Sequence, residues 1–218
     1  MSEISNDFCK KVTYFCIESS VDLWYNQVRK MTWRDNMIDL LALEKSLISP
    51  HIKAGGTVVD FTMGNGHDTL WLSRAVGEEG RVFAFDIQAQ ALESTRSLLD
   101  ENGAKNCTLI LDSHSNVCQY VKEPICAGLF NLGFLPGGDK SITTLVKTTL
   151  PAIRYGIELL CDDGGLLIAV YPGHEEGTRE GEQIEQMLAE YDRRKICCSK
   201  FKIVNSPSSP FFFLVEKK

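Results

Sequence analysis

The feature that most constrains the fold is a regular alternation of short β-rich runs with longer segments of helical periodicity. The first five predicted strands cover 57–61, 81–87, 107–111, 127–132 and 166–171. The longest predicted helices cover 88–102, 141–161 and 175–191. A strand, a helix and a second strand in succession form a parallel βαβ unit with a right-handed crossover. The sequence therefore predicts an α/β protein built on a mostly parallel sheet.

Two later β-rich runs, 198–204 and 211–215, have only a short turn with Pro207 and Pro210 between them. A parallel crossover needs a dozen or more residues, so these two runs are predicted to pair in the antiparallel sense. The expected sheet has seven strands, with an antiparallel last strand. This α/β domain is predicted to cover 37–218.

Residues 1–36 stand apart as a predicted N-terminal helical extension, because apolar residues such as Phe8, Val12 and Phe15 recur at helical spacing. Two interpretations stay open: the helices pack on the domain, or they form the seam of a homodimer.

Composition limits the partners and the compartment. No apolar run approaches the ~20 residues that cross a bilayer, and the acidic N-terminus does not resemble a signal peptide, so a cytoplasmic protein without membrane contact is expected. The net charge of −6, from 23 Lys+Arg and 29 Asp+Glu, argues against nucleic acid as a partner. Its distribution weakens that objection, because many carboxylates are assigned to the helix 175–191, predicted to be solvated. Those glutamates are Glu175, Glu176, Glu180, Glu182, Glu185 and Glu190.

Basic residues gather in two stretches that could contact a few phosphates. One stretch holds Arg193, Arg194, Lys195, Lys200 and Lys202, and the other holds Lys140 and Lys147. The alternative is that these side chains are simply solvated.

The eight cysteines are scattered and show no Cys-x-x-Cys or Cys/His spacing of the zinc type. They are predicted to behave as small buried hydrophobic residues, and no metal site is expected. Disulfides or a bound metal are the alternatives.

The motif that carries the chemistry follows the first strand and reads acidic-x-x-x-Gly-x-Gly, with Asp60, Gly64 and Gly66. Glycines there allow positive φ and a close approach of the backbone to a ligand. The carboxyl end of a parallel strand at the switch point of the sheet is where such folds bind ligands. Asp86 ends the second strand, where a carboxylate can accept hydrogen bonds from a ribose diol.

The kind of nucleotide cofactor is predicted from a glycine that the motif lacks. A dinucleotide fingerprint has a third glycine, and Thr69 occupies that position here. Asp60 would repel a pyrophosphate but suits a ligand with a cationic amino-acid end, which describes S-adenosylmethionine. A Rossmann-like methyltransferase is favoured over an NAD(P) enzyme and over a noncatalytic domain of the same fold.

Three later strand ends supply further candidates. Asp112, Ser113 and His114 follow the third strand, where an adenine edge is usually held; Asp112 or Ser113 could instead cap the next helix. Asn131 ends the fourth strand and begins a loop with Phe134, suited to orienting and packing an amine, unless the loop is only a structural turn.

The last of these strand ends is that of the fifth predicted strand. Tyr171 and His174 are expected to face the same crevice, with a helix cap as the alternative for His174.

At these residues the chain resembles a known family, the small bacterial methyltransferases labelled putative rRNA methylases. The stretches that carry the resemblance are 57–68, 86–88, 131–144 and 171–174. Members have been identified as tRNA 5-(aminomethyl)-2-thiouridine methyltransferases. The resemblance implies a class I S-adenosylmethionine-dependent methyltransferase that methylates the exocyclic amine of the modified wobble uridine, position 34, in the tRNA anticodon stem-loop. An rRNA or a small-molecule amine is the alternative substrate.

Carried over by motif, the implied cofactor contacts are Asn65, Asp68, Asp86, Gln88, Ser113 and His114. Asn131 is the candidate for orienting the amine, and Asp139, Tyr171 and His174 are candidates for taking its proton. The sequence departs from the family's Asn-x-Pro-Pro pattern before the last strand, because two serines separate Pro207 from Pro210.

Overall fold

A single seven-stranded sheet organises the part of the chain that the structure, a computed structural model, describes, which is residues 40–218. Its strands lie in the order β3-β2-β1-β4-β5-β7-β6. They are β1 (Thr57–Asp60), β2 (Arg81–Asp86), β3 (Cys107–Leu111), β4 (Ile125–Asn131), β5 (Leu160–Val170), β6 (Ile196–Phe201) and β7 (Phe211–Lys217). The helices are α2 (Leu40–Ile48), α3 (His67–Val76), α4 (Ala89–Glu101), α5 (Val117–Tyr120), α6 (Val146–Leu159) and α7 (Glu175–Ala189). Two 3₁₀ turns, η1 (Ser49–His51) and η2 (His114–Asn116), complete the elements.

The directions of the strands confirm the predicted topology. The strands from β3 to β5 are mutually parallel, whereas β7 runs antiparallel to both β5 and β6. The order reverses between β1 and β4, which makes their carboxyl ends the switch point where folds of this kind bind ligands.

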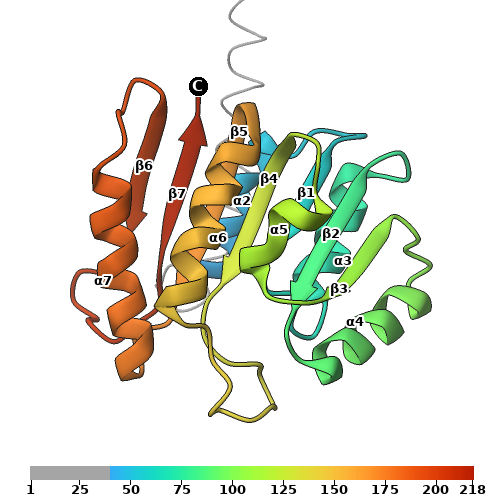
Figure 1. The fold of residues 1–218 in the computed structure, drawn as a ribbon, viewed down its shortest axis with the longest axis horizontal. Helices are drawn as coiled ribbons and strands as arrows, with labels where there is room; N and C mark the ends of the chain where they lie inside the picture. Colours follow the sequence, from blue (N-terminus) through green and yellow to red (C-terminus); the bar gives the residue numbers. More distant parts are fainter. Residues whose placement is uncertain (1–39) are drawn as a thin grey trace, which may run out of the picture. The chain divides into compact units, whose positions relative to one another are not determined.

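Helices cover both faces of the sheet within residues 44–218. In Figure 1, α5, α6 and α7 lie in front of the sheet, and α3 lies behind it, against β1 and β2. The largest core cluster joins the sheet to the front helices, and its centre is a stacked pair of rings: Phe61, after β1, and Phe130, in β4, have centroids 4.1 Å apart. This packing holds the carboxyl ends of the two switch-point strands against each other.

Several element boundaries differ from the prediction, and the three largest differences are in α6, β5 and β6. The helix expected over 141–161 begins only at Val146, because Thr143 forms a β-bridge with Phe134 and Leu145 is extended. β5 begins at Leu160, six residues before the predicted start, and its pairing with β4 contains a register irregularity. β6 ends at Phe201 rather than at 204. For α6 and β5, pairing with another segment, which periodicity does not encode, sets the start of the element.

The predicted helical extension over 1–36, and with it the homodimer seam, lies outside the described residues. Within them, no helix is long and apolar enough to cross a membrane.

Candidate functional site

The predicted site residues converge on one edge of the sheet, where the parallel strands end. Asp60, Asp86 and Asn131 are the last residues of β1, β2 and β4, and Tyr171 follows β5 directly. The long loop between β4 and α6, drawn in yellow in Figure 1, leaves the sheet from this same edge. The edge therefore gathers segments that are more than one hundred residues apart in the sequence.

The glycine-rich turn after β1 has the backbone that its sequence predicts. Gly64 and Gly66 have φ values of 52° and 85°, which favour glycine. A Cβ at Gly66 would lie 2.8 Å from Oγ1 of Thr95, so no larger residue fits. Gly66 is followed by α3, and the turn leaves backbone without side chains at the start of that helix.

Asp86 ties this turn to the end of β2. Its carboxylate accepts hydrogen bonds from the backbone N–H of Gly64, at 3.1 Å, and of Gln88, at 3.0 Å. Burial raises its pKa, although these backbone donors oppose the shift. Each carboxylate oxygen can accept more than one hydrogen bond, so the predicted contact with a ribose diol stays compatible with this arrangement.

Asp60, the last residue of β1, is fully buried. Its carboxylate accepts from the hydroxyl of Thr69, at 2.6 Å, and from the backbone N–H of Thr62, at 3.2 Å. Burial, with smaller contributions from the charges of Asp68 and Asp86, raises the pKa of Asp60 to about 7. In the structure Asp60 thus joins the strand to the helix that follows it.

The end of β3 shows the capping alternatives that the sequence left open. Ser113 accepts from the backbone N–H of Ser115 and caps η2. Asp112 accepts from Ser113 N–H, from the amide of Asn116 and from the hydroxyl of Tyr120. Their roles toward an adenine stay predictions.

His114 is buried, and its Nδ1 lies 3.2 Å from the carbonyl oxygen of Phe61. Burial lowers its pKa to about 4, so the imidazole is neutral at physiological pH. Its Nε2 is buried and has no hydrogen-bond partner among the described residues. Two apolar side chains are exposed at the ends of β2 and β3: Ile87 directly follows β2, and Leu111 is the last residue of β3.

Asn131 and Asp68 meet at the switch point. The side-chain amide of Asn131 donates to Oδ2 of Asp68 at 2.9 Å, and its backbone N–H donates to the hydroxyl of Thr62 at 2.7 Å. The other carboxylate oxygen of Asp68 forms an ion pair with Lys45 at 2.9 Å. The ammonium of Lys45 also lies over the ring of Trp71, 5.2 Å from its centroid. The sequence contains no pattern that links Lys45, in α2, to this site.

The loop between β4 and α6 reaches back to the glycine-rich turn. Leu135 is buried in a small cluster with Met63, and Asn65 donates its side-chain amide to the carbonyl oxygen of Pro136 at 3.2 Å. Asn65 therefore contacts this loop, in addition to the cofactor contact that the resemblance implies.

Two charged side chains lie farther along the same loop. Lys140 lies over the exposed ring of Phe134, at 5.5 Å. Asp139 is exposed, and hydrogen bonds from Ser141 lower the pKa of its carboxyl.

Tyr171 and His174 border the loop from the end of β5. Burial raises the pKa of Tyr171, and the nearby charges of Glu44 and Asp68 add to the shift, so the phenol is neutral. His174 caps α7, because its Nδ1 accepts from the backbone N–H of Gly177 at 3.0 Å, and its ring lies 6.0 Å from that of Phe134.

The prediction of solvent exposure is wrong for one carboxylate in this region. Glu180 was expected on a solvated helix face, but the side chain is fully buried and accepts hydrogen bonds from Thr144 and Thr149. Because α7 contains many glutamates, its composition indicated a solvated helix and did not single out Glu180 as buried. The spacing of the buried residues Gly177, Glu180, Gly181 and Ile184 could have identified it as part of the inward face.

The basic stretch 193–202 is divided by β6, which separates its ends by ~20 Å at ~3.3 Å per residue. Lys200 and Lys202 lie near Phe211, which pairs with Val170 at the carboxyl end of β5. Arg194 precedes β6 and so lies at the opposite side of the sheet, where the parallel strands begin; it is paired with Asp192. Only Lys200 and Lys202 of this stretch therefore belong to the edge that carries the candidate site.

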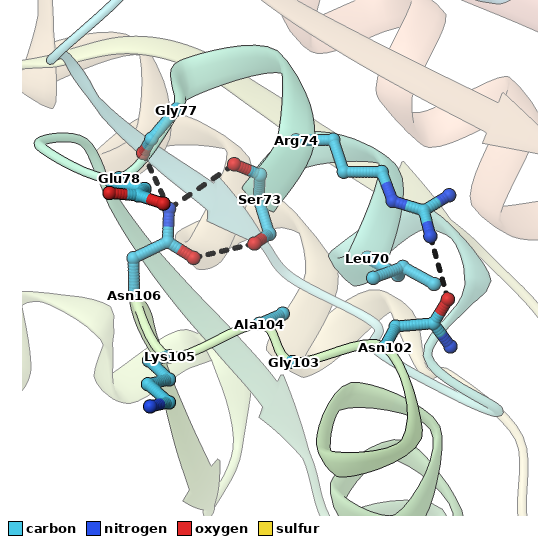
Figure 2. A pocket seen from close by; sticks show the side chains of 10 residues that line it. All are labelled: Leu70, Ser73, Arg74, Gly77, Glu78, Asn102, Gly103, Ala104, Lys105 and Asn106. Carbon is cyan, nitrogen blue, oxygen red and sulfur yellow. Dashed lines mark hydrogen bonds between the residues drawn. The ribbon is translucent and has the colours of Figure 1, made fainter.

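A separate groove of about 590 Å³ lies at that opposite edge, between the end of α3 and the loop before β3 (Figure 2). Asn106 holds its walls together, because its side chain is hydrogen-bonded to Ser73 and to the carbonyl oxygen of Gly77. The groove contains none of the predicted site residues.

These observations test whether the residues fit S-adenosylmethionine. Gly64 offers backbone without a side chain, where a Cβ would make no contact closer than 3.6 Å, and the carboxylate of Asp86 ends the neighbouring strand. The exposed apolar side chains of Ile87 and Leu111 lie next to Asp86, in the chain and across the sheet respectively. This combination of a bare backbone, a diol acceptor and an apolar surface fits a nucleoside. Among the described residues, no group of three or more His, Cys, Asp or Glu side chains could hold a metal ion.

Comparison with known proteins agrees with this geometry. The family model described as "Putative rRNA methylase" matches residues 82–217, and that of the ubiE/COQ5 methyltransferase family matches 23–122. A "tRNA (mnm(5)s(2)U34)-methyltransferase, chloroplastic" of Arabidopsis thaliana is 38% identical over 178 residues, which are 77% of this chain and 65% of the relative. The chain thus spans less than two thirds of the length of that curated relative.

Two solved structures are similar over nearly their whole length. A "putative rRNA-methylase" from Clostridium thermocellum has a TM-score of 0.80 at 38% identity, covering 82% of this chain and 97% of that one. A methyltransferase from Streptococcus mutans in complex with SAH has a TM-score of 0.75 at 37% identity, with the same coverage.

Proposed function

The chain belongs to the "Putative rRNA methylase" family, and we propose that it is an RNA methyltransferase whose target is a modified wobble uridine of tRNA. The fold is that of class I S-adenosylmethionine-dependent methyltransferases, and S-adenosylmethionine is the cofactor. The proposed reaction is N-methylation of the aminomethyl group of 5-aminomethyl-2-thiouridine. The observation that carries this choice is Asn131 at the switch point, in a chain 38% identical to a relative whose name gives the methylated form of this wobble nucleoside.

The cofactor site consists of the turn at Gly64 and Gly66, the carboxylate of Asp86 and the ends of β3 and β4. When bound, S-adenosylmethionine supplies an electrophilic methyl group on a sulfonium centre. The protein positions the two reactants and excludes water, since holding them in a reactive geometry removes much of the entropic barrier.

Asn131 orients the substrate amine in this proposal. Its amide nitrogen donates to Asp68, so the amide oxygen is the group that can accept a hydrogen bond from an amine. Asp68 is itself held by Lys45. The charge of Lys45 partly balances that of Asp68, which disfavours capture of the amine as an ion pair in place of the neutral nucleophile.

An aminomethyl group is largely protonated at neutral pH and must lose a proton before it can attack. Of the three candidate acceptors, Asp139 is an exposed carboxylate that can accept a proton, although the hydrogen bonds from Ser141 lower its pKa and so weaken it as a base. Tyr171 is neutral, and Nδ1 of His174 is used by the helix cap. We assign proton acceptance to Asp139, and the packing of the target base to Tyr171, His174 and Phe134.

Ribosomal RNA is a second candidate substrate, because the description of the matching family model names it. A small-molecule amine would use the same cofactor site. The three substrates differ in whether an anticodon stem-loop must be present.

The test is transfer of a labelled methyl group by the purified chain. We expect methylation of tRNA that carries 5-aminomethyl-2-thiouridine, and the nucleoside released by digestion should gain the mass of one methyl group. Control reactions contain the same tRNA without the aminomethyl group, deproteinised ribosomal RNA, and the free nucleoside. Methylation of the unmodified tRNA or of ribosomal RNA at the same rate would refute the proposed target.

A further inference from the structure

We propose that Glu180 is a positioning residue for methyl transfer, because it clamps the neck of the loop that carries the substrate-side residues. This role rests on the proposed function. Glu180 forms its hydrogen bonds with Thr144 and Thr149, neither of which is a predicted site residue, and it acts through Thr144 and Gly133.

The clamp consists of two short hydrogen bonds to one buried carboxylate. The hydroxyl of Thr144 donates to Oε2 of Glu180 at 2.6 Å, and that of Thr149 donates to Oε1 at 2.6 Å. Glu180 belongs to α7, whereas Thr144 precedes α6 and Thr149 lies in its first turns. The carboxylate therefore joins two helices and the loop between β4 and α6.

Thr144 closes the neck of that loop. Its hydroxyl accepts from the backbone N–H of Gly133 at 2.9 Å, and its own N–H donates to the carbonyl oxygen of Gly133 at 3.0 Å. One step farther into the loop, Phe134 and Thr143 form an antiparallel bridge. Residues 134–143 therefore form a closed loop whose two ends are fixed to each other and to α7.

The neck lies directly beside the proposed chemistry. Gly133 is two residues from Asn131, and its φ of 132° is a conformation that favours glycine. The closed loop contains Phe134, Asp139 and Lys140. A shift at the neck would move these three side chains relative to Asn131, and displacements of this kind can lower a rate without loss of the fold.

Burying the carboxyl group of Glu180 costs free energy of solvation, which its hydrogen bonds must offset. Burial raises its pKa, while the hydroxyls of Thr144 and Thr149 lower it, and the charges of Glu176 and His174 contribute less. A buried carboxyl that serves only packing is readily replaced by an apolar residue. Glu180 instead accepts from two separate segments at once, which an apolar side chain cannot do.

The experiment compares the wild-type chain with Glu180→Gln, Thr144→Val and Thr144→Ser. Glu182→Gln is the matched control, because Glu182 lies on the exposed face of the same helix. Hydrogen exchange of residues 133–145 measures the clamp without any substrate. Steady-state kinetics with modified tRNA measures kcat and KM, calorimetry measures the affinity for S-adenosylmethionine, and thermal unfolding confirms that each variant folds.

We expect Glu180→Gln and Thr144→Val to exchange faster in 133–145 and to lose on the order of 10- to 100-fold in kcat, with unchanged affinity for S-adenosylmethionine. Thr144→Ser should keep the wild-type exchange rate in 133–145 and the wild-type kcat, because serine keeps the hydroxyl group. Glu182→Gln should match wild type.

Unchanged exchange in Glu180→Gln would overturn the clamp, and faster exchange with an unchanged kcat would overturn the positioning role. If the wild-type chain transfers no methyl group to any RNA, the proposed function fails. The exchange measurement then decides the clamp alone.

Discussion

The side-chain amide of Asn131 donates a hydrogen bond of 2.9 Å to the carboxylate of Asp68, across the switch point of the sheet. The two residues are 63 positions apart, at the end of β4 and in the first turn of α3. This contact orients the amide, so the substrate-side and cofactor-side segments are coupled at one point.

Asp68→Ala should lower kcat on modified tRNA by ~100-fold, because the Asn131 amide loses the acceptor that orients it. Single-turnover kinetics at saturating tRNA measures the effect. The control is Asn205→Ala in the exposed turn before β7, which should retain the wild-type rate. A wild-type rate in Asp68→Ala would show that the orientation of Asn131 does not limit transfer.

Gly66→Ala should destabilise the fold by about 1–3 kcal/mol and weaken binding of S-adenosylmethionine. The residue has a φ of 85°, and the added Cβ would lie within 2.9 Å of Thr95. Urea denaturation and calorimetry measure the two effects. Gly173→Ala is the stability control, because its Cβ would meet nothing within 4 Å and its backbone needs no positive φ. Equal stability of the two variants would contradict this account of the turn.

Asp60→Asn should remove a pH-dependent component of stability. Burial raises the pKa of Asp60 from 3.8 to about 7, so its protonated form is favoured in the folded protein. Its contribution to the free energy of unfolding is therefore fully present below pH 4 and is lost as the pH rises through about 7.

Asparagine resembles the protonated acid at all pH values, so the variant should gain stability relative to wild type as the pH rises across this window. Urea denaturation at a series of pH values measures the difference. Parallel curves for the two proteins would show that Asp60 does not titrate there.

Lys140→Ala and Lys202→Ala should each weaken tRNA binding and reduce the slope of log affinity against log salt by about 1. Both lysines lie at the edge of the sheet that carries the proposed site, near the exposed ring of Phe134 and the ring of Phe211. Arg194→Ala is the matched control, because Arg194 lies at the opposite edge and is paired with Asp192. An equal loss in Arg194→Ala would place the RNA on a different face.

Much of the fold follows from local sequence patterns. The alternation of strands and helices and the short turn before 211 correctly predict seven strands with one antiparallel member. The glycine-rich motif predicts the positive φ of Gly64 and Gly66, because a backbone conformation depends mainly on the residue that adopts it. The carboxyl ends of parallel strands share one edge, so the convergence of Asp86 and Asn131 also follows from topology.

The sequence by itself therefore determined the class of fold, the family and the edge at which the predicted site residues gather. The tertiary structure alone decided which carboxylates are buried and what they bind. Asp60 and Glu180 belong to different local patterns, and both are buried because threonines from other segments supply donors. The same structure divided one basic stretch between two edges of the sheet. A sequence pattern specifies which side of an element faces inward, but the partners there come from segments distant in the chain, and their positions exist only once the sheet is assembled.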